Sequence, residues 1–224
     1  MKPYFRHRRG TCGMKIIALN SSPRKDWNTA LVLKKALEGA ASAGADTEYV
    51  HLNDISYRGC QSCFACKTKG GKSYGKCGFN DDLTPVLNRI EEADAFIMGS
   101  PIYFGEVPGM MRNLMERLVF PRYEYTKSPL LSPRMIRNAH VYTMNINHET
   151  MEGWLKPKFD SIQGMYERVM GRAETLAVTK TLQWDDYSKY VTDGTDEAEK
   201  KESRREKFPV DLEAAYQLGI RLVS

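Results

Sequence analysis

The chain has 224 residues, of which 42% are hydrophobic and 27% are charged. This length allows one α/β domain with a sizeable core, and no apolar run approaches the roughly 18 residues that a membrane-spanning helix needs. The amino terminus also lacks the apolar segment of a secretory signal. We therefore expect a cytoplasmic protein without a membrane partner.

The formal net charge of +5 is concentrated at the amino terminus. Residues 1–13 contain four basic side chains and no acidic one, which leaves +1 of the total +5 for residues 14–224. A nucleic-acid-binding domain carries a basic stripe on a folded face, so we expect no nucleic-acid partner. We interpret residues 1–13 as a disordered basic arm and residues 14–224 as a single domain with a C-terminal extension, 183–224.

From residue 14 onward, strand and helix patterns alternate. In chain order, the sequence predicts strand 15–19, helix 28–43, strand 47–52, helix 83–90, strand 94–100, helix 108–118, strand 139–145, helix 150–170, strand 174–179 and a last helix from about residue 209. The strands are short apolar runs, as in sheets that are covered on both faces. The last predicted strand has an alternative, longer form that also includes residues 181–184.

Turn and capping residues support the helix boundaries. Gly44 follows the first helix at a typical C-terminal cap position, and Asp81 or Asp82 can cap the second. Pro108 is placed to start the third helix, whereas Pro157 should disturb the first turns of the fourth.

The alternation predicts an α/β fold, a doubly wound five-stranded parallel sheet with helices on both faces. The expected strand order is 2-1-3-4-5, which reverses between strands one and three. Ligands of such sheets bind beyond the carboxyl ends of the strands at this reversal. The loops that follow strands one and three therefore carry the most functional information.

The loop after the first strand, residues 20–29, is polar and leads directly into a helix. Hydroxyl groups, backbone N–H groups and the positive end of a helix dipole favour an anion, and Arg24 can add charge-assisted hydrogen bonds. The loop lacks both the dinucleotide-binding glycine pattern and the P-loop pattern. It is a candidate phosphate site, and the alternative is an ordinary polar loop in which Asn28 or Thr29 caps the helix.

The loop after the third strand, residues 100–109, places Tyr103 and Phe104 beside Gly105. Aromatic side chains and open backbone N–H groups suit a flat ring with polar edges, whereas the alternative is a tight turn with its aromatic side chains in the core. The two loops should face each other where the strand order reverses. This arrangement binds flavin mononucleotide (FMN) in open α/β sheets.

At these residues the sequence resembles the flavodoxin-like NAD(P)H-dependent FMN reductases, including the branch of iron-sulfur flavoproteins. The resemblance rests on ALNSSPRKDWNTALVL and on a cysteine segment followed by DDLTPVLNRIEEADAFIMGSPIYFGEVPGMMRNLMERL. It implies a flavodoxin-like fold in which the FMN phosphate is held by Ser22, Arg24, Asn28 and Thr29. It also implies that the flavin ring is lined by Pro101, Ile102, Tyr103, Phe104 and Gly105, with a third loop near residues 145–148.

The resemblance further implies an oxidoreductase that passes electrons from NAD(P)H through FMN to a quinone, a flavin or another acceptor, in a homodimer or homotetramer. No catalytic acid or base is then obligatory, and we expect His140, within a strand pattern, to be structural. Two alternatives remain open, a non-enzymatic flavodoxin or iron-sulfur flavoprotein that only carries electrons, and a zinc-stabilised binding module.

The segment GCQSCFACKTKGGKSYGKC, residues 59–77, contains Cys60, Cys63, Cys66 and Cys77. Four thiolates could hold a [4Fe–4S] cluster, with the lysines of the segment offsetting its negative charge. The alternatives are buried structural thiols, a zinc site or a disulfide.

Two further segments lack clear periodicity. Residues 119–138 are long for a loop in a compact domain, which predicts a lid or a dimer contact that brings Tyr123 or Tyr125 near the flavin, or else a surface excursion. The polar stretch 183–207 predicts a solvated helix or an arm around a partner subunit.

Overall fold

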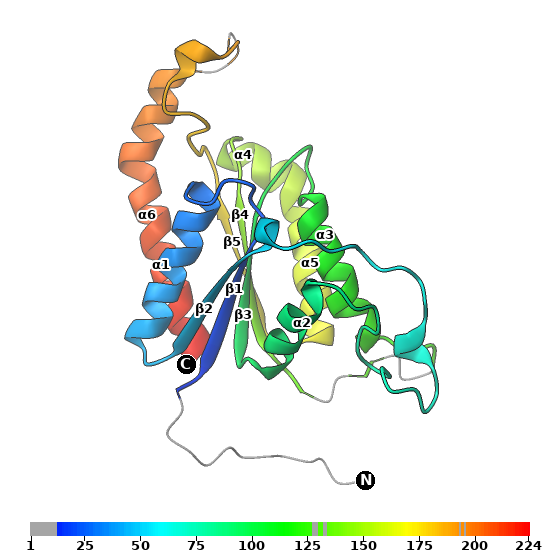
Figure 1. The fold of residues 1–224 in the computed structure, drawn as a ribbon. Coiled ribbons are helices and arrows are strands. Elements are labelled where there is room, and N and C mark those ends of the chain that lie inside the picture. Colours follow the sequence, from blue (N-terminus) through cyan, green and yellow to red (C-terminus); the bar gives the residue numbers. More distant parts are fainter. Residues whose placement is uncertain (1–12, 127–129, 132–133, 193, 195) are drawn as a thin grey trace.

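A computed structural model describes residues 13–126, 130–131, 134–192, 194 and 196–224. The predicted basic arm lies outside these residues, except for Gly13. Five strands form one parallel sheet in the order β2-β1-β3-β4-β5 (Figure 1), which confirms the predicted topology. The strands are β1 (Lys15–Asn20), β2 (Asp46–His51), β3 (Ala95–Pro101), β4 (Arg137–Thr143) and β5 (Ala173–Val178).

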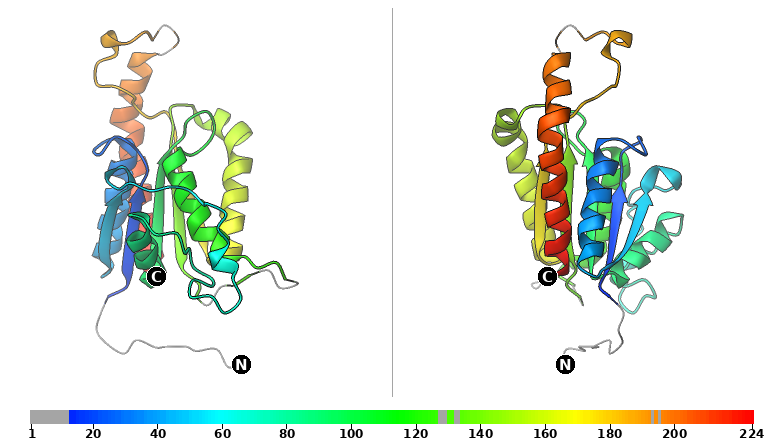
Figure 2. Two further views of the ribbon diagram at one scale, coloured as in Figure 1. Left: turned by 45° about the vertical axis from the view of Figure 1, so that its right-hand side comes forward. Right: turned by 90° about the vertical axis from the view of Figure 1, so that its left-hand side faces the viewer.

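Helices cover both faces of the sheet, so that α1 and α6 lie on one face and α2, α3 and α5 lie on the other (Figures 1 and 2). The helices are α1 (Asn28–Ser42), α2 (Leu83–Glu92), α3 (Gly109–Val119), α4 (His148–Thr150), α5 (Lys156–Val169) and α6 (Glu197–Val223). Pro157 lies in the first turn of α5, and a π-helical turn, Met151–Leu155, joins it to α4, so the expected disturbance is confirmed.

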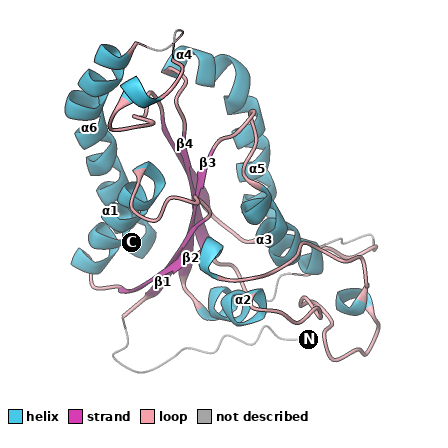
Figure 3. Ribbon diagram, turned by 45° about the horizontal axis from the view of Figure 1, so that its top comes forward, coloured by secondary structure: helices cyan, strands magenta, loops and turns pink. Residues whose placement is uncertain are grey.

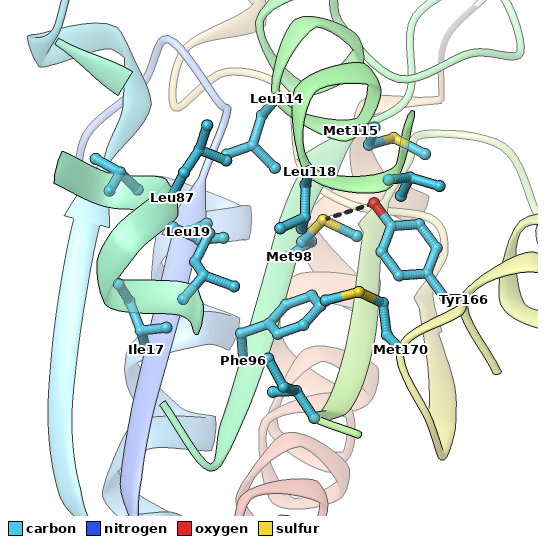
Figure 4. Close-up of a cluster of buried hydrophobic side chains, with 14 of the residues drawn as sticks. Ile17, Leu19, Leu87, Phe96, Met98, Leu114, Met115, Leu118, Tyr166 and Met170 are labelled. Atoms are coloured by element: carbon cyan, nitrogen blue, oxygen red, sulfur yellow. Dashed lines mark hydrogen bonds between the residues drawn. The ribbon is translucent and has the colours of Figure 1, made fainter. Parts of the chain in front are cut away.

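Successive residues of each strand point to opposite faces, which explains the continuous apolar runs. Ile16 and Ala18 pack with α1 and α6, whereas Ile17 and Leu19 pack with α2 and α3. Figure 4 shows the second of these clusters, in which the Tyr166 hydroxyl of α5 contacts the Met98 sulfur of β3 at 3.6 Å. Each face therefore has its own core.

The last helix begins much earlier than the sequence pattern predicts. Helix α6 starts at Glu197 rather than near Pro209, which lies inside it, and the Asp196 side chain caps it by accepting a hydrogen bond from the Glu199 N–H. Pro209 cannot donate to the Arg205 carbonyl, but both residues are exposed, so water is available to that carbonyl. Residues 181–184 belong to a loop, so the longer form of the last strand is wrong. None of the described helices is both long and apolar enough to cross a membrane.

Helices α1 and α6 run side by side at close approach. A Cβ atom on Gly219 of α6 would collide with the Ala36 carbonyl oxygen of α1, and one on Gly39 would collide with the Tyr216 carbonyl oxygen. Only glycine fits at these two positions because the obstacles are backbone atoms, which cannot rotate away. The pair of glycines therefore sets the distance between the two helices.

We expect the substitution Gly219→Ala to lower the free energy of unfolding by about 1–3 kcal/mol, since overpacking outweighs the gain in helix propensity. The matched control is Gly164→Ala in α5, where a Cβ would meet no atom within 4 Å. That change should raise stability by about 0.5–1 kcal/mol. Urea unfolding monitored by circular dichroism measures both, and equal stabilisation by the two substitutions would contradict the close packing.

Candidate functional site

Four loops meet at the carboxyl edge of the sheet (Figure 3). Their residues line a cavity of about 140 Å³. The loops follow β1, β3, β4 and β5. The lining residues are Ser22, Arg24, Trp27, Asn28, Thr29, Pro101, Ile102, Tyr103, Thr143, Met144, Asn145, Thr181, Leu182 and Gln183. Seven of the nine residues predicted to contact FMN are among them, and Phe104 and Gly105 are the two that are not. Of the third loop predicted at 145–148, only Asn145 lines the cavity.

The loop after β1 is fixed by its own hydrogen bonds. The Asn20 side chain accepts a hydrogen bond of 2.9 Å from the Ser22 N–H, and the Ser22 hydroxyl accepts one of 3.2 Å from the Arg24 N–H. Helix α1 then begins at Asn28 with Trp27 at its N-cap, and no side chain among the described residues caps it. The alternative in which Asn28 or Thr29 caps the helix is therefore wrong. The first-turn N–H groups and the helix dipole remain free to bind an anion.

The loop after β5 lies against this first loop, a contact that the sequence pattern did not predict. The Leu182 carbonyl accepts hydrogen bonds from the Trp27 indole at 3.0 Å and from the Asn28 amide at 2.8 Å. The Arg24 guanidinium donates to the Gln183 carbonyl at 2.5 Å and lies 4.7 Å from the centre of the Trp27 ring. These contacts join residues more than 150 positions apart, so no local signal could have revealed them.

The loop after β3 makes a tight turn in which Tyr103 and Glu106 exchange two backbone hydrogen bonds. Phe104 and Gly105 both have positive φ, and a Cβ on Gly105 would lie 2.9 Å from the Trp154 ring. The Phe104 side chain is fully exposed and Tyr103 is nearly half-exposed. The alternative interpretation, a tight turn with its aromatic side chains in the core, is thus right about the turn but wrong about the side chains.

The end of β4 and the loop that follows it also line the cavity. The hydroxyls of Thr143 and Thr29 share a hydrogen bond of 2.7 Å, and both side chains are buried. The Asn145 side-chain oxygen is buried and has no hydrogen-bond partner among the described residues. The Asn145 carbonyl accepts a hydrogen bond of 2.6 Å from Lys200 of α6.

The four predicted metal ligands surround one small cavity of about 20 Å³ on the outer side of α3. All four are free thiols, of which Cys66 is buried and Cys63 is exposed. Burial raises the pKa of the Cys66 thiol. Ser62 and Phe64 have positive φ although neither is glycine, so the backbone around Cys63 is strained. Among the described residues no three metal-binding side chains are close enough to hold an ion, and the cluster stays a prediction.

Arg117 of α3 anchors this cysteine segment. Its guanidinium is buried, pairs with Asp81 at 2.6 Å, and donates to the carbonyls of Arg58 and Phe79 and to the Cys77 sulfur. Burial alone would raise the pKa of Asp81, but the hydrogen bonds from Arg117 and from two backbone N–H groups hold it below its usual range. Lys67 donates instead to the carbonyls of Phe120, Pro121 and Tyr123, and so it is committed to structural contacts.

The segment after α3 lies at the amino-terminal edge of the sheet, opposite the four loops. Arg134 pairs with Asp94, at the start of β3, and the Ile136 N–H donates to the Met170 carbonyl. A lid that brings Tyr123 or Tyr125 over the cavity of the same chain is therefore wrong. The predicted dimer contact is not tested, and residues 127–129 and 132–133 lie outside the described residues.

His140 is buried in β4 with its ring 4.6 Å from the Tyr166 ring, as expected for a structural histidine. Its Nε2 contacts the Asn138 side-chain oxygen at 3.1 Å. Burial lowers the pKa of His140 to about 3. The ring therefore stays neutral in the folded protein through the pH range in which a histidine ordinarily takes up a proton.

The sheet order and the loops beyond its carboxyl edge define a flavodoxin-like fold. A model of the NADPH-dependent FMN reductase family matches residues 14–133. This match covers more than half of the chain, which belongs to that family.

The curated relatives are iron-sulfur flavoproteins. One from Methanocaldococcus jannaschii is 39% identical over 104 residues, 46% of this chain and 51% of the relative. One from Archaeoglobus fulgidus is 31% identical over 142 residues, 63% of this chain and 60% of the relative. The chain thus spans about half the length of the curated relatives it matches.

Solved structures show the same fold across nearly the whole chain. An NAD(P)H:quinone oxidoreductase from Methanothermobacter marburgensis has a TM-score of 0.65 at 16% identity, covering 95% of this chain and 98% of its own. An azoreductase from Bacillus anthracis has a TM-score of 0.62 at 14% identity, covering 93% and 99%. At these identities the likeness shows the fold alone.

The buried His140 makes stability depend on pH. The unfolded chain takes up a proton on this ring near pH 6.5, whereas the folded chain does so only near pH 3. The free energy of unfolding therefore keeps the full contribution of the buried neutral ring above about pH 6.5. Below that pH this contribution falls by up to about 1.4 kcal/mol per pH unit. We expect urea unfolding of His140→Phe to lack this part of the slope between about pH 6.5 and 4. The control His148→Gln, which removes an exposed ring, should retain it, and an unchanged slope in His140→Phe would contradict the buried neutral ring.

Proposed function

We propose that the chain is an FMN-dependent oxidoreductase that takes electrons from NAD(P)H and passes them to a quinone, a flavin or another small-molecule acceptor. The observation that carries this proposal is the cavity at the carboxyl edge. It joins an uncapped helix terminus, buried hydroxyl groups and an arginine on one side to the half-exposed Tyr103 on the other. Membership of the FMN reductase family supports the same ligand.

The polar side of the cavity suits the phosphate and the sugar chain of FMN. Ser22, Asn28 and Thr29 are buried polar residues around the first turn of α1, where backbone N–H groups and the helix dipole favour an anion. At about 140 Å³ the cavity is smaller than a typical site for a whole cofactor. The flavin ring would therefore lie toward the open side, where Tyr103 and Phe104 are exposed.

When bound, FMN supplies the redox chemistry, since it accepts a hydride from a nicotinamide and returns the electrons to an acceptor. The residues of this chain bind and orient the cofactor. No histidine, aspartate or glutamate is among the described residues that line the cavity, so we assign no catalytic acid or base.

Turnover distinguishes this enzyme from an electron carrier or a zinc-stabilised module. The chain purified with FMN should oxidise NADH or NADPH in many cycles when a quinone is supplied. A carrier would be reduced slowly or not at all by either nucleotide, and a module would bind no flavin. Absence of multiple turnovers with both nucleotides and several acceptors would exclude the oxidoreductase.

A charge placed at the phosphate position tests the assignment of the first loop. We expect Ser22→Asp to weaken FMN binding roughly a hundredfold or more, because a carboxylate beside a phosphate costs several kcal/mol at short range. Asparagine is the matched control, since Ser22→Asn has nearly the same shape without the charge and either side chain can accept from the Arg24 N–H. Equal affinities in the two variants, measured by flavin fluorescence, would place the phosphate elsewhere.

We also propose that Cys60, Cys63, Cys66 and Cys77 hold an iron-sulfur cluster, as the names of the curated relatives suggest. Four thiols border one cavity and are the ligands that such a cluster takes. Among the described residues no three of them are close enough to hold a metal ion, so the segment would have to open and rearrange. The glycines of the segment, at 70, 71 and 75, provide the backbone freedom for this rearrangement.

Anaerobic purification should therefore yield about four iron and four sulfide per chain, and Cys63→Ser should lower the iron content while leaving FMN in place. Cys63 is the exposed thiol, so its substitution does not disturb the core. Iron-free protein that is full of flavin, prepared both with and without air, would exclude the cluster and leave the oxidoreductase proposal standing.

Self-association into a homodimer or homotetramer is a further part of the proposal. Phe104 and Trp154 are exposed apolar side chains beside the cavity, and such side chains are common in interfaces. Sedimentation equilibrium distinguishes these assemblies from a monomer, and a monomer at all concentrations would exclude them.

A further inference from the structure

The amino-terminal half of α6 extends beyond the carboxyl edge of the sheet (Figures 1 and 2). Two of its basic residues contact residues that line the cavity. Lys200 is 7% exposed, and its ammonium donates to the Asn145 carbonyl at 2.6 Å. Arg204, one turn further along, is partly buried and donates to the Asn28 side-chain oxygen at 3.0 Å. Asn28 and Asn145 both line the cavity.

Neither of these cations forms an ion pair in the part of the chain that the structure describes, and the carboxylates of Glu199 and Asp185 act on them only at longer range. Other basic residues of α6 do form ion pairs, since Lys201 pairs with Glu197 at 2.5 Å and Lys207 with Asp211 at 2.7 Å. Burial lowers the pKa of Lys200 and of Arg204, which reflects the cost of holding each charge away from water. Two buried or partly buried positive charges that form no ion pair favour the binding of an anion in the cavity beside them.

The contacts of Arg204 connect α6 with the loops after β1 and β5. Its guanidinium lies 4.0 Å from the centre of the Phe208 ring, which holds it against the helix. Its bond to the Asn28 oxygen fixes the orientation of that amide, whose nitrogen then donates to the Leu182 carbonyl. Arg204 thus sets the position of Asn28, at the first turn of α1, without lining the cavity itself.

Lys200 acts on the loop after β4 in the same way. Its ammonium holds the Asn145 carbonyl, while the buried Asn145 side-chain oxygen has no partner among the described residues. Arg24, the cation of the first loop, already donates to the Gln183 carbonyl. Because hydrogen bonds to neutral groups leave these cations charged, Lys200 and Arg204 add two positive charges to that of Arg24.

We propose that Arg204 and Lys200 are positioning residues for the phosphate end of the cofactor, which hold Asn28 and Asn145 in place and offset the phosphate charge from behind the cavity. The inference rests on the proposed function, since it takes FMN as the ligand. Both residues carry a positive charge that attracts the phosphate group but not the uncharged flavin ring, so their effect on affinity should depend on the phosphate.

Comparison of FMN with riboflavin, which lacks the phosphate, isolates this effect. Apoprotein of the full chain is titrated with each flavin, and the quenching of flavin fluorescence gives the two dissociation constants. We expect Arg204→Gln and Lys200→Met each to weaken FMN binding roughly tenfold and riboflavin binding less than twofold, as for a charge several ångströms away in a partly buried site. Arg204→Lys, which keeps the charge, should recover most of the FMN affinity.

Lys201→Gln and Arg205→Gln are matched controls because both remove exposed basic residues of the same helix that have acidic partners. They should leave both flavin affinities unchanged. Equal loss of FMN and riboflavin affinity in Arg204→Gln and Lys200→Met would assign these residues a merely structural role and overturn the inference, as would unchanged binding of FMN. Wild-type chain that binds neither flavin would instead overturn the proposed function.

Discussion

The close approach of α1 and α6 at Gly39 and Gly219 determines where the amino-terminal half of α6 lies. With any larger residue at these crossings the two helices would have to separate, because the opposing atoms belong to the backbone. Helix α6 spans 27 residues, about 40 Å at 1.5 Å per residue, and so it continues past the end of the sheet. This overhang carries Lys200 and Arg204 to the loops of the cavity. The glycine contacts between the two helices therefore determine where the positive charges of Lys200 and Arg204 lie relative to the cavity.

The two faces of the sheet carry different chemistry. The cavity at the carboxyl edge draws on α1, α6 and four loops, whereas the cysteine segment is held against α3 by the buried Arg117. Arg117 is stable there because Asp81 and two carbonyls surround its guanidinium, and an unpaired charge in that position would be costly. The candidate flavin site therefore does not depend on whether the cysteines hold a cluster, since the contacts that build it come from other elements.

The sequence was sufficient for the five strands and most helices, because their apolar patterns follow local periodicity. The strand order followed from the rules for open parallel sheets. The sequence pattern placed the apolar start of α6 too late, although the solvated helix predicted within 183–207 is confirmed from Glu197 onward. Residues 197–207 are polar on almost every side, and their helix is supported by the Asp196 cap and by ion pairs such as Lys201 with Glu197 rather than by an apolar stripe. The polar first loop and the aromatic second loop were likewise evident from composition. The loop after β5 was not, since its bonds to Arg24 and Asn28 connect distant residues through backbone carbonyls. Long-range bonds of this kind have no local pattern.

We propose that the four loops at the carboxyl edge form one flavin site that α6 supports from behind. Hydrogen–deuterium exchange of the apoprotein with and without FMN tests it most directly, because it reports where the ligand binds. Slower exchange on adding FMN is expected in residues 20–30, 100–105, 143–145 and 179–184, together with the amino-terminal half of α6. Protection confined to another part of the chain, or no protection at saturating FMN, would contradict the account.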